Sequence, residues 1–93
     1  MVATLIIHLH LPTCASLKEK RGRIKPLMSR LRREFNVSVA ELDLQDQWQE
    51  AVIGCAMIGG GRGNLEAALQ AVTRWVEANW PDGMILEDKI EIL

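Results

Sequence analysis

Residues 2–11, VATLIIHLHL, decide the fold because apolar side chains recur at every second position. One set of alternating positions is wholly apolar: Ala3, Leu5, Ile7, Leu9 and Leu11. The other set holds Thr4, His8 and His10, interrupted by Ile6. A period of two is typical of a β-strand with one buried face. Pro12 ends this strand, since proline cannot donate a hydrogen bond to a sheet.

An amphipathic helix is predicted after this strand. Ser16 and Glu19 have the spacing of a capping box, in which each side chain accepts from the backbone N–H of the other residue. Apolar residues then follow at helical spacings: Leu17, Ile24, Leu27, Met28, Leu31 and Phe35. Pro26 removes a hydrogen bond to the carbonyl of Gly22. We therefore expect either a kink or two pieces, a turn near 16–22 and a helix that starts at Pro26.

The second half of the chain predicts two more strands, a helix and a last strand. Residues 37–44 and 48–58 form a hairpin around a turn at 45–47. Glycine-rich residues 59–63 are expected to be irregular, with Asn64 as the N-cap of a helix. That helix has an apolar stripe of Leu65, Leu69, Val72 and Val76. After a turn at 81–83, a last strand alternates apolar Met84, Leu86, Ile90 and Ile92 with charges, and Asp88 is out of pattern.

The order β-α-β-β-α-β predicts one α+β domain over residues 1–93, of the ferredoxin-like kind. In that topology a four-stranded antiparallel sheet carries both helices on one face and leaves the other face uncovered. The length suits one small domain, and 48% apolar with 25% charged residues is an ordinary globular composition. We expect a cytoplasmic protein without membrane contact, because no signal peptide and no apolar run of about 20 residues occur.

Charge is strongly segregated along the chain, although the net charge is only −1. Residues 17–33 hold eight basic residues against Glu19, a net +7, whereas residues 34–93 hold three basic residues against eleven acidic ones, a net −8. Such segregation favours an anionic partner. The expected phosphate contacts are Lys18, Lys20, Arg21, Arg23, Lys25, Arg30, Arg32 and Arg33. The alternative is a solvated helix face whose long side chains cover the core.

The sequence supports a metal site or an acid–base catalytic site less well than it supports an anionic partner. His8 and His10 lie on one strand face, and Cys55 would join them if its strand pairs with the first, but a stable site needs three or four ligands. No spacing selects catalysis among the hairpin carboxylates, which are Glu41, Asp43, Asp46 and Glu50. We therefore expect no catalytic residues, no metal and no cofactor.

Trp48 is the one aromatic residue that suggests a contact with a base. A Trp at the expected start of the third strand is usually an anchor at the rim or in the core, but if it lies on the open face it can stack on a base or seal a dimer. The chain has only three Trp and one Phe, and it lacks the aromatic run of an RNA-recognition motif. Any contact with nucleic acid is therefore expected to involve mainly its backbone and shape.

Three stretches resemble the YlxP-like family of small bacterial proteins. They are SLKEKR at 16–21, RLRREFNVSVAE at 30–41, and QD at 45–46 with WQ at 48–49. The resemblance implies a ferredoxin-like fold and supplies no catalytic mechanism. Relatives are often encoded beside the genes for translation initiation factor two and ribosome-binding factor A, which implies a link to translation or ribosome maturation.

Three hypotheses follow for the function. The leading one is a non-enzymatic accessory protein that binds RNA or the ribosome through the basic segment, with Trp48 as a further contact. The second is a protein-interaction module that forms a homodimer through the open sheet face. The third, a small phosphate-handling enzyme, fits poorly, because the loop after the first strand, residues 11–16, contains no glycine.

Overall fold

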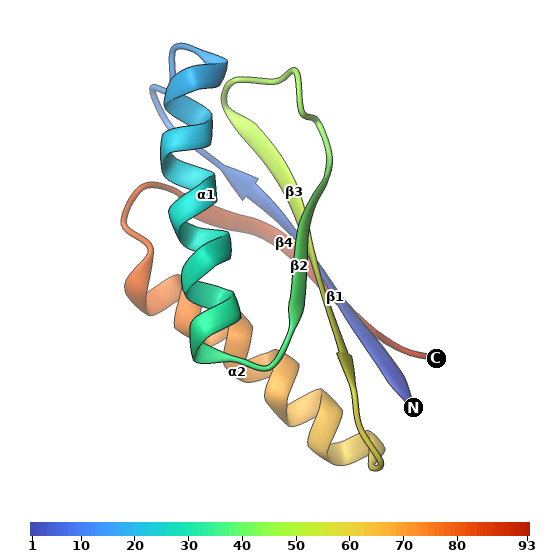
Figure 1. Ribbon diagram of the computed structural model, residues 1–93. Helices are drawn as coiled ribbons and strands as arrows, with labels where there is room; N and C mark the ends of the chain where they lie inside the picture. The colour runs from blue at the N-terminus through green and yellow to red at the C-terminus, as the bar shows by residue number, and fades with distance from the viewer.

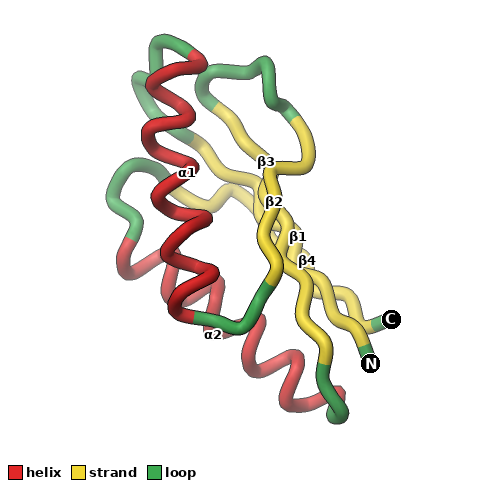
Figure 2. The backbone as a smooth tube through the Cα atoms, viewed as in Figure 1, coloured by secondary structure: helices red, strands yellow, loops and turns green.

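Six elements follow one another in the predicted order in the computed structural model, which describes residues 1–93 (Figure 1). They are β1 (Val2–His10), α1 (Leu17–Glu34), β2 (Ser38–Asp43), β3 (Glu50–Ile58), α2 (Arg62–Asn79) and β4 (Met84–Ile92). The strands form one antiparallel sheet in the order β2-β3-β1-β4. Both helices cover the same face of that sheet (Figure 2), which confirms the ferredoxin-like α+β fold. Neither helix is long and apolar enough to cross a membrane.

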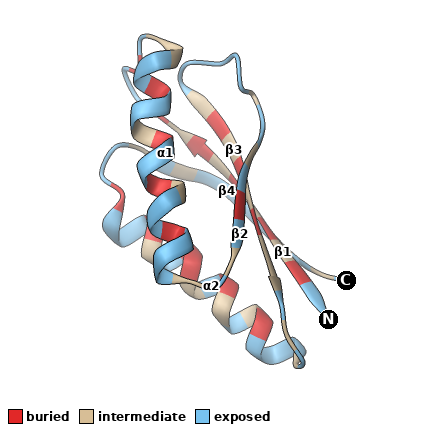
Figure 3. Cartoon of the chain, in the orientation of Figure 1, coloured by how far each residue is buried: buried red, intermediate tan, exposed pale blue.

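The alternation of β1 builds the centre of the core. Its inward-facing Ala3, Leu5, Ile7 and Leu9 are completely buried, as is Leu11 directly after the strand. The facing residues of β3 are Ala51, Ile53 and Cys55. Each helix adds a buried stripe over this layer (Figure 3). The stripes are Ile24, Leu27 and Leu31 on α1, and Leu65, Leu69, Val72 and Val76 on α2. The predicted apolar faces of both helices are thereby confirmed.

Helix α1 is continuous through Pro26, so the expectation of two separate pieces is wrong. Pro26 lies on the exposed side of the helix, where the unpaired carbonyl of Gly22 can be hydrated. Burial of the stripe on the opposite side offsets the roughly 3 kcal/mol that an interior proline costs. The capping box is only half confirmed: Ser16 Oγ accepts from the N–H of Glu19 at 3.1 Å, but the Glu19 carboxylate accepts from Ala15 at 2.6 Å.

Two element boundaries differ from the prediction. Strand β3 begins at Glu50, so the connection from β2 is a longer loop, Leu44–Gln49, that contains Trp48. Helix α2 begins at Arg62 and has Gly61 as its N-cap, which places Asn64 inside the first turn. Glycine is well tolerated at the N-cap. The extended backbone of Gly61, with φ −132° and ψ 131°, lets the helix start before Asn64.

Strand β4 contains a bulge that the alternation of its residues did not predict. Leu9 pairs with Ile85 and His8 pairs with Glu87, so Leu86 is an additional residue. Ile85 therefore faces the helices, while Leu86 is exposed, contrary to the expected alternation. Beyond the bulge Asp88 also faces the helices, and Thr73 Oγ1 donates to its carboxylate at 3.3 Å. This contact explains why an acid interrupts the apolar pattern.

Candidate nucleic-acid interface

Lys20 belongs to the core and cannot reach a phosphate, so its predicted role is wrong. Only 2% of the residue is exposed. Its ammonium donates to the carbonyl of Leu44 at 2.7 Å and lies 3.1 Å from Glu41 Oε2. The sequence did hold a signal for this, because Lys20 precedes the buried Ile24 by four residues and therefore lies on the same helix face.

Arg23 is also held within the fold. Its Nη1 donates to the carbonyls of Pro12 at 2.9 Å and Asp82 at 3.1 Å, and its Nη2 donates to Glu19 at 3.1 Å. The N–H of Ala15 and then this guanidinium hold the pKa of Glu19 below its ordinary value. Arg23 thus joins the start of α1 to the turn before β4, and it has little freedom to contact a ligand.

Arg30 and Arg32 are exposed, but each guanidinium makes contacts within the fold. The Arg30 guanidinium lies 4.7 Å from the ring centre of Trp75, a cation–π contact between the two helices. Arg32 Nη2 donates to the carbonyl of Val39 on the edge strand β2 at 2.8 Å. A guanidinium has five N–H donors, so the single bond of Arg32 leaves others available to a ligand.

The remaining cations are exposed and form no ion pair: Lys18, Arg21, Lys25 and Arg33. Spacings of three, four and seven residues place Lys18, Arg21, Lys25 and Arg32 on one flank of α1. We call these four residues the α1 basic stripe. At a rise of 1.5 Å per residue, the stripe extends over about 21 Å. Such a row of cations matches the repeating phosphates of a nucleic-acid backbone.

Trp48 lies in the loop between β2 and β3 rather than at the start of a strand on the open face. The residue is 53% exposed. Lys20 donates to the carbonyl of Leu44 at the start of this loop. Figure 1 shows the β2–β3 loop beside the first turns of α1. The structure therefore places the loop of Trp48 at the same end of the molecule as Lys18 and Arg21.

The histidines and Cys55 do not converge. His8 Nε2 lies 2.8 Å from Glu50 Oε1, and His10 Nδ1 lies 3.1 Å from the carbonyl of Gln49. Cys55 pairs with Leu5 on the helix-covered face, opposite to the face of the histidines, so it cannot join them. Burial raises the pKa of the Cys55 thiol to about 11. No group of three or more His, Cys, Asp or Glu side chains is placed to hold a metal ion.

The hairpin carboxylates are dispersed over different surroundings. Glu41 faces α1 and pairs with Lys20, whereas Glu50 pairs with His8. Asp43 accepts from the backbone N–H of Leu44 at 2.8 Å. Asp46 and Glu50 line a shared open hollow of about 420 Å³ with Trp48, whereas Glu41 lies apart from it, so the four carboxylates do not form one cluster.

The uncovered sheet face has an apolar hollow of about 230 Å³ over β2, β3 and β1. Its lining includes Thr4, Ile6, Ala40, Leu42, Gly54 and Ala56. Leu42 lies over Gly54, where an added Cβ would be 2.5 Å from Leu42 Cδ1. The absence of a side chain at Gly54 thus creates the space that Leu42 occupies.

Two comparisons with known proteins agree with each other. A family described as protein of unknown function (DUF503) matches residues 2–89. The uncharacterized protein YlxP of Bacillus subtilis (strain 168) is 38% identical over 63 residues, which are 68% of this chain and 68% of that protein. The chain therefore belongs to the DUF503, or YlxP-like, family of proteins of unknown function.

Proposed function

We propose that this protein is a non-enzymatic accessory factor that binds RNA, in the context of the ribosome, through the α1 basic stripe. The observation that carries the proposal is the division of the basic segment into two groups. Lys20 and Arg23 form ion pairs and hydrogen bonds within the fold. Lys18, Arg21 and Lys25 are exposed, form no ion pair and lie in a row along one flank of α1.

The scaffold beneath the stripe favours binding. The buried contacts of Lys20 and the hydrogen bonds of Arg23 fix the first half of α1 to one end of the sheet, where β1 and β2 end and β4 begins. Phosphate contacts from a fixed helix need little further ordering of the backbone. Because the surface offers only Trp48 as an exposed aromatic ring, affinity would come mainly from phosphates, and four contacts would give a log–log salt slope of about −3.

Co-sedimentation with purified ribosomal subunits across a salt series tests the proposal. The variant Arg21→Glu/Lys25→Glu should lose retention near physiological salt and reduce the salt slope by about 1.5–2. A matched control, Arg62→Glu/Arg74→Glu, changes the net charge equally but alters exposed cations of α2. Equal loss in both variants would indicate generic attraction to a polyanion, and unchanged retention in the first variant would remove the stripe from the mechanism.

A homodimer through the open sheet face is a second candidate. The apolar hollow around Leu42 and Gly54 supports it, because an apolar depression on an uncovered face is a common feature of association surfaces. Light scattering at high protein concentration distinguishes the two states. A monomer there would count against the dimer and would leave the RNA proposal intact.

A further inference from the structure

Strand β4 is an edge strand with unused backbone hydrogen-bonding groups. Leu93 donates to the carbonyl of Val2 at 2.8 Å, and bonded pairs alternate along an antiparallel ladder. The N–H and C=O groups of Asp88, Ile90 and Ile92 therefore point away from β1. No other part of the chain pairs with these groups. The opposite edge is partly covered, since Arg32 of α1 bonds to Val39 of β2.

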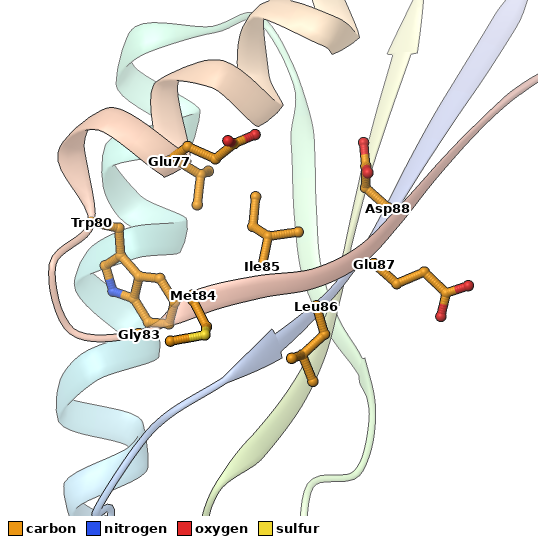
Figure 4. A pocket seen from close by; sticks show the side chains of 9 residues that line it. Glu77, Trp80, Gly83, Met84, Ile85, Leu86, Glu87 and Asp88 are labelled. Carbon is orange, nitrogen blue, oxygen red and sulfur yellow. The ribbon is translucent and has the colours of Figure 1, made fainter.

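A cavity of about 440 Å³ lies between the end of α2 and the first half of β4, and it reaches the free edge at Asp88. Val76, Trp80 and Ile85 form apolar parts of its wall. Figure 4 shows Ile85 and Asp88 on the side of β4 that faces Glu77 of α2, and Leu86 on the opposite side. The cavity is thus placed to receive a side chain from a strand added along β4.

The charge around the cavity and edge is negative. Residues 77–93 hold five acidic residues and only Lys89, a net charge of −4. Glu77, Glu87 and Asp88 line the cavity and have no cationic partner, while Lys89 is already paired with Glu91 at 3.0 Å. Three carboxylates without a counter-charge around this cavity favour a cationic partner.

We propose that the β4 edge binds an extended, lysine- and arginine-rich protein segment that adds a fifth strand and places one large apolar side chain in the cavity. A second copy of β4 fits poorly, because antiparallel pairing would bring the same carboxylates together. The basic helix α1 of a second copy also fits poorly, since a helix has no free backbone groups to pair with a strand edge.

The probe for this proposal is a fluorescent nine-residue peptide in which lysine alternates with valine around a central leucine. Binding is measured by fluorescence polarisation, and hydrogen exchange is followed residue by residue with NMR. We expect the amides of Asp88, Ile90 and Ile92 to become protected in the complex. The same peptide with N-methyl groups on alternate residues should bind about tenfold or more weakly, because it loses the donors of the added strand.

Charge reversal tests the acidic surroundings. Glu77→Lys/Glu87→Lys should weaken peptide binding about tenfold, whereas Glu34→Lys/Asp46→Lys, with the same change in net charge at exposed and unpaired acids elsewhere, should remain within about twofold. Circular dichroism checks that both variants are folded. Equal weakening in both variants, unchanged β4 amides, or undiminished binding of the N-methylated peptide would each overturn the proposal. Protection of the β4 amides that rises with protein concentration alone would assign the edge to a second copy.

Discussion

Lys20 illustrates how a charged side chain becomes part of a core when its partners are fixed. Replacing it with methionine would remove the counter-charge of Glu41 Oε2, a buried atom that accepts no hydrogen bond, and the donor to the carbonyl of Leu44. We expect Lys20→Met to lower the free energy of unfolding by about 2–4 kcal/mol in urea titrations at pH 7.

The exposed Lys25, which has no ion pair, provides the matched control. Lys25→Met should change stability by less than about 0.5 kcal/mol. The double variant Lys20→Met/Glu41→Leu should recover part of the loss, because no unpaired buried charge is left. Equal stability of the two single variants would show that the buried pair contributes nothing to the fold.

For single residues, the sequence predicts which side chains are exposed better than it predicts their hydrogen-bond and ion-pair partners. Exposed Lys18, Arg21 and Lys25 follow from helical spacing alone. The hydrogen bonds of Arg23 do not follow from helical spacing, because their acceptors, Pro12 and Asp82, are 11 and 59 residues away along the chain. Separating available cations from structural ones therefore required the tertiary structure.

At the scale of elements, Pro26 shows how packing overrides local preference. Pro26→Ala restores the N–H that the carbonyl of Gly22 lacks and removes an interior proline from a continuous helix. We expect the free energy of unfolding to rise by about 1–3 kcal/mol, as measured by thermal unfolding with circular dichroism. An unchanged melting temperature would mean that the ring's restriction of the unfolded chain already offsets the missing bond.

The order and type of every element followed from periodicity and turn residues, whereas the bulge in β4 did not. Met84 and Leu86 alternate as a regular strand would, and nothing local marks the extra residue. Its position is set by pairing with β1, where His8 meets Glu87 and Leu9 meets Ile85. Register of this kind depends on a neighbour 70 or more residues away, so single-strand patterns cannot reveal it.

At the scale of the whole molecule, the two proposed surfaces lie on opposite edges of one sheet. The α1 basic stripe adjoins β2, while the acidic cavity adjoins β4, at the other end of the strand order β2-β3-β1-β4. Although the net charge is only −1, the surface therefore has a basic side next to β2 and an acidic side next to β4. At physiological salt the Debye length is about 8 Å, so each surface acts on its partner with little influence from the other.

If the two surfaces act independently, charge reversal on one surface should weaken only the interaction of that surface. Arg21→Glu/Lys25→Glu should abolish retention on ribosomal subunits and leave affinity for the basic peptide within about twofold. Glu77→Lys/Glu87→Lys should do the reverse, although it changes the net charge from −1 to +3. Both variants are measured in both assays at 0.15 M salt. If each variant weakened both interactions, the surfaces would be coupled through the fold; if the second variant strengthened ribosome retention severalfold, net charge rather than the aligned stripe would govern RNA binding.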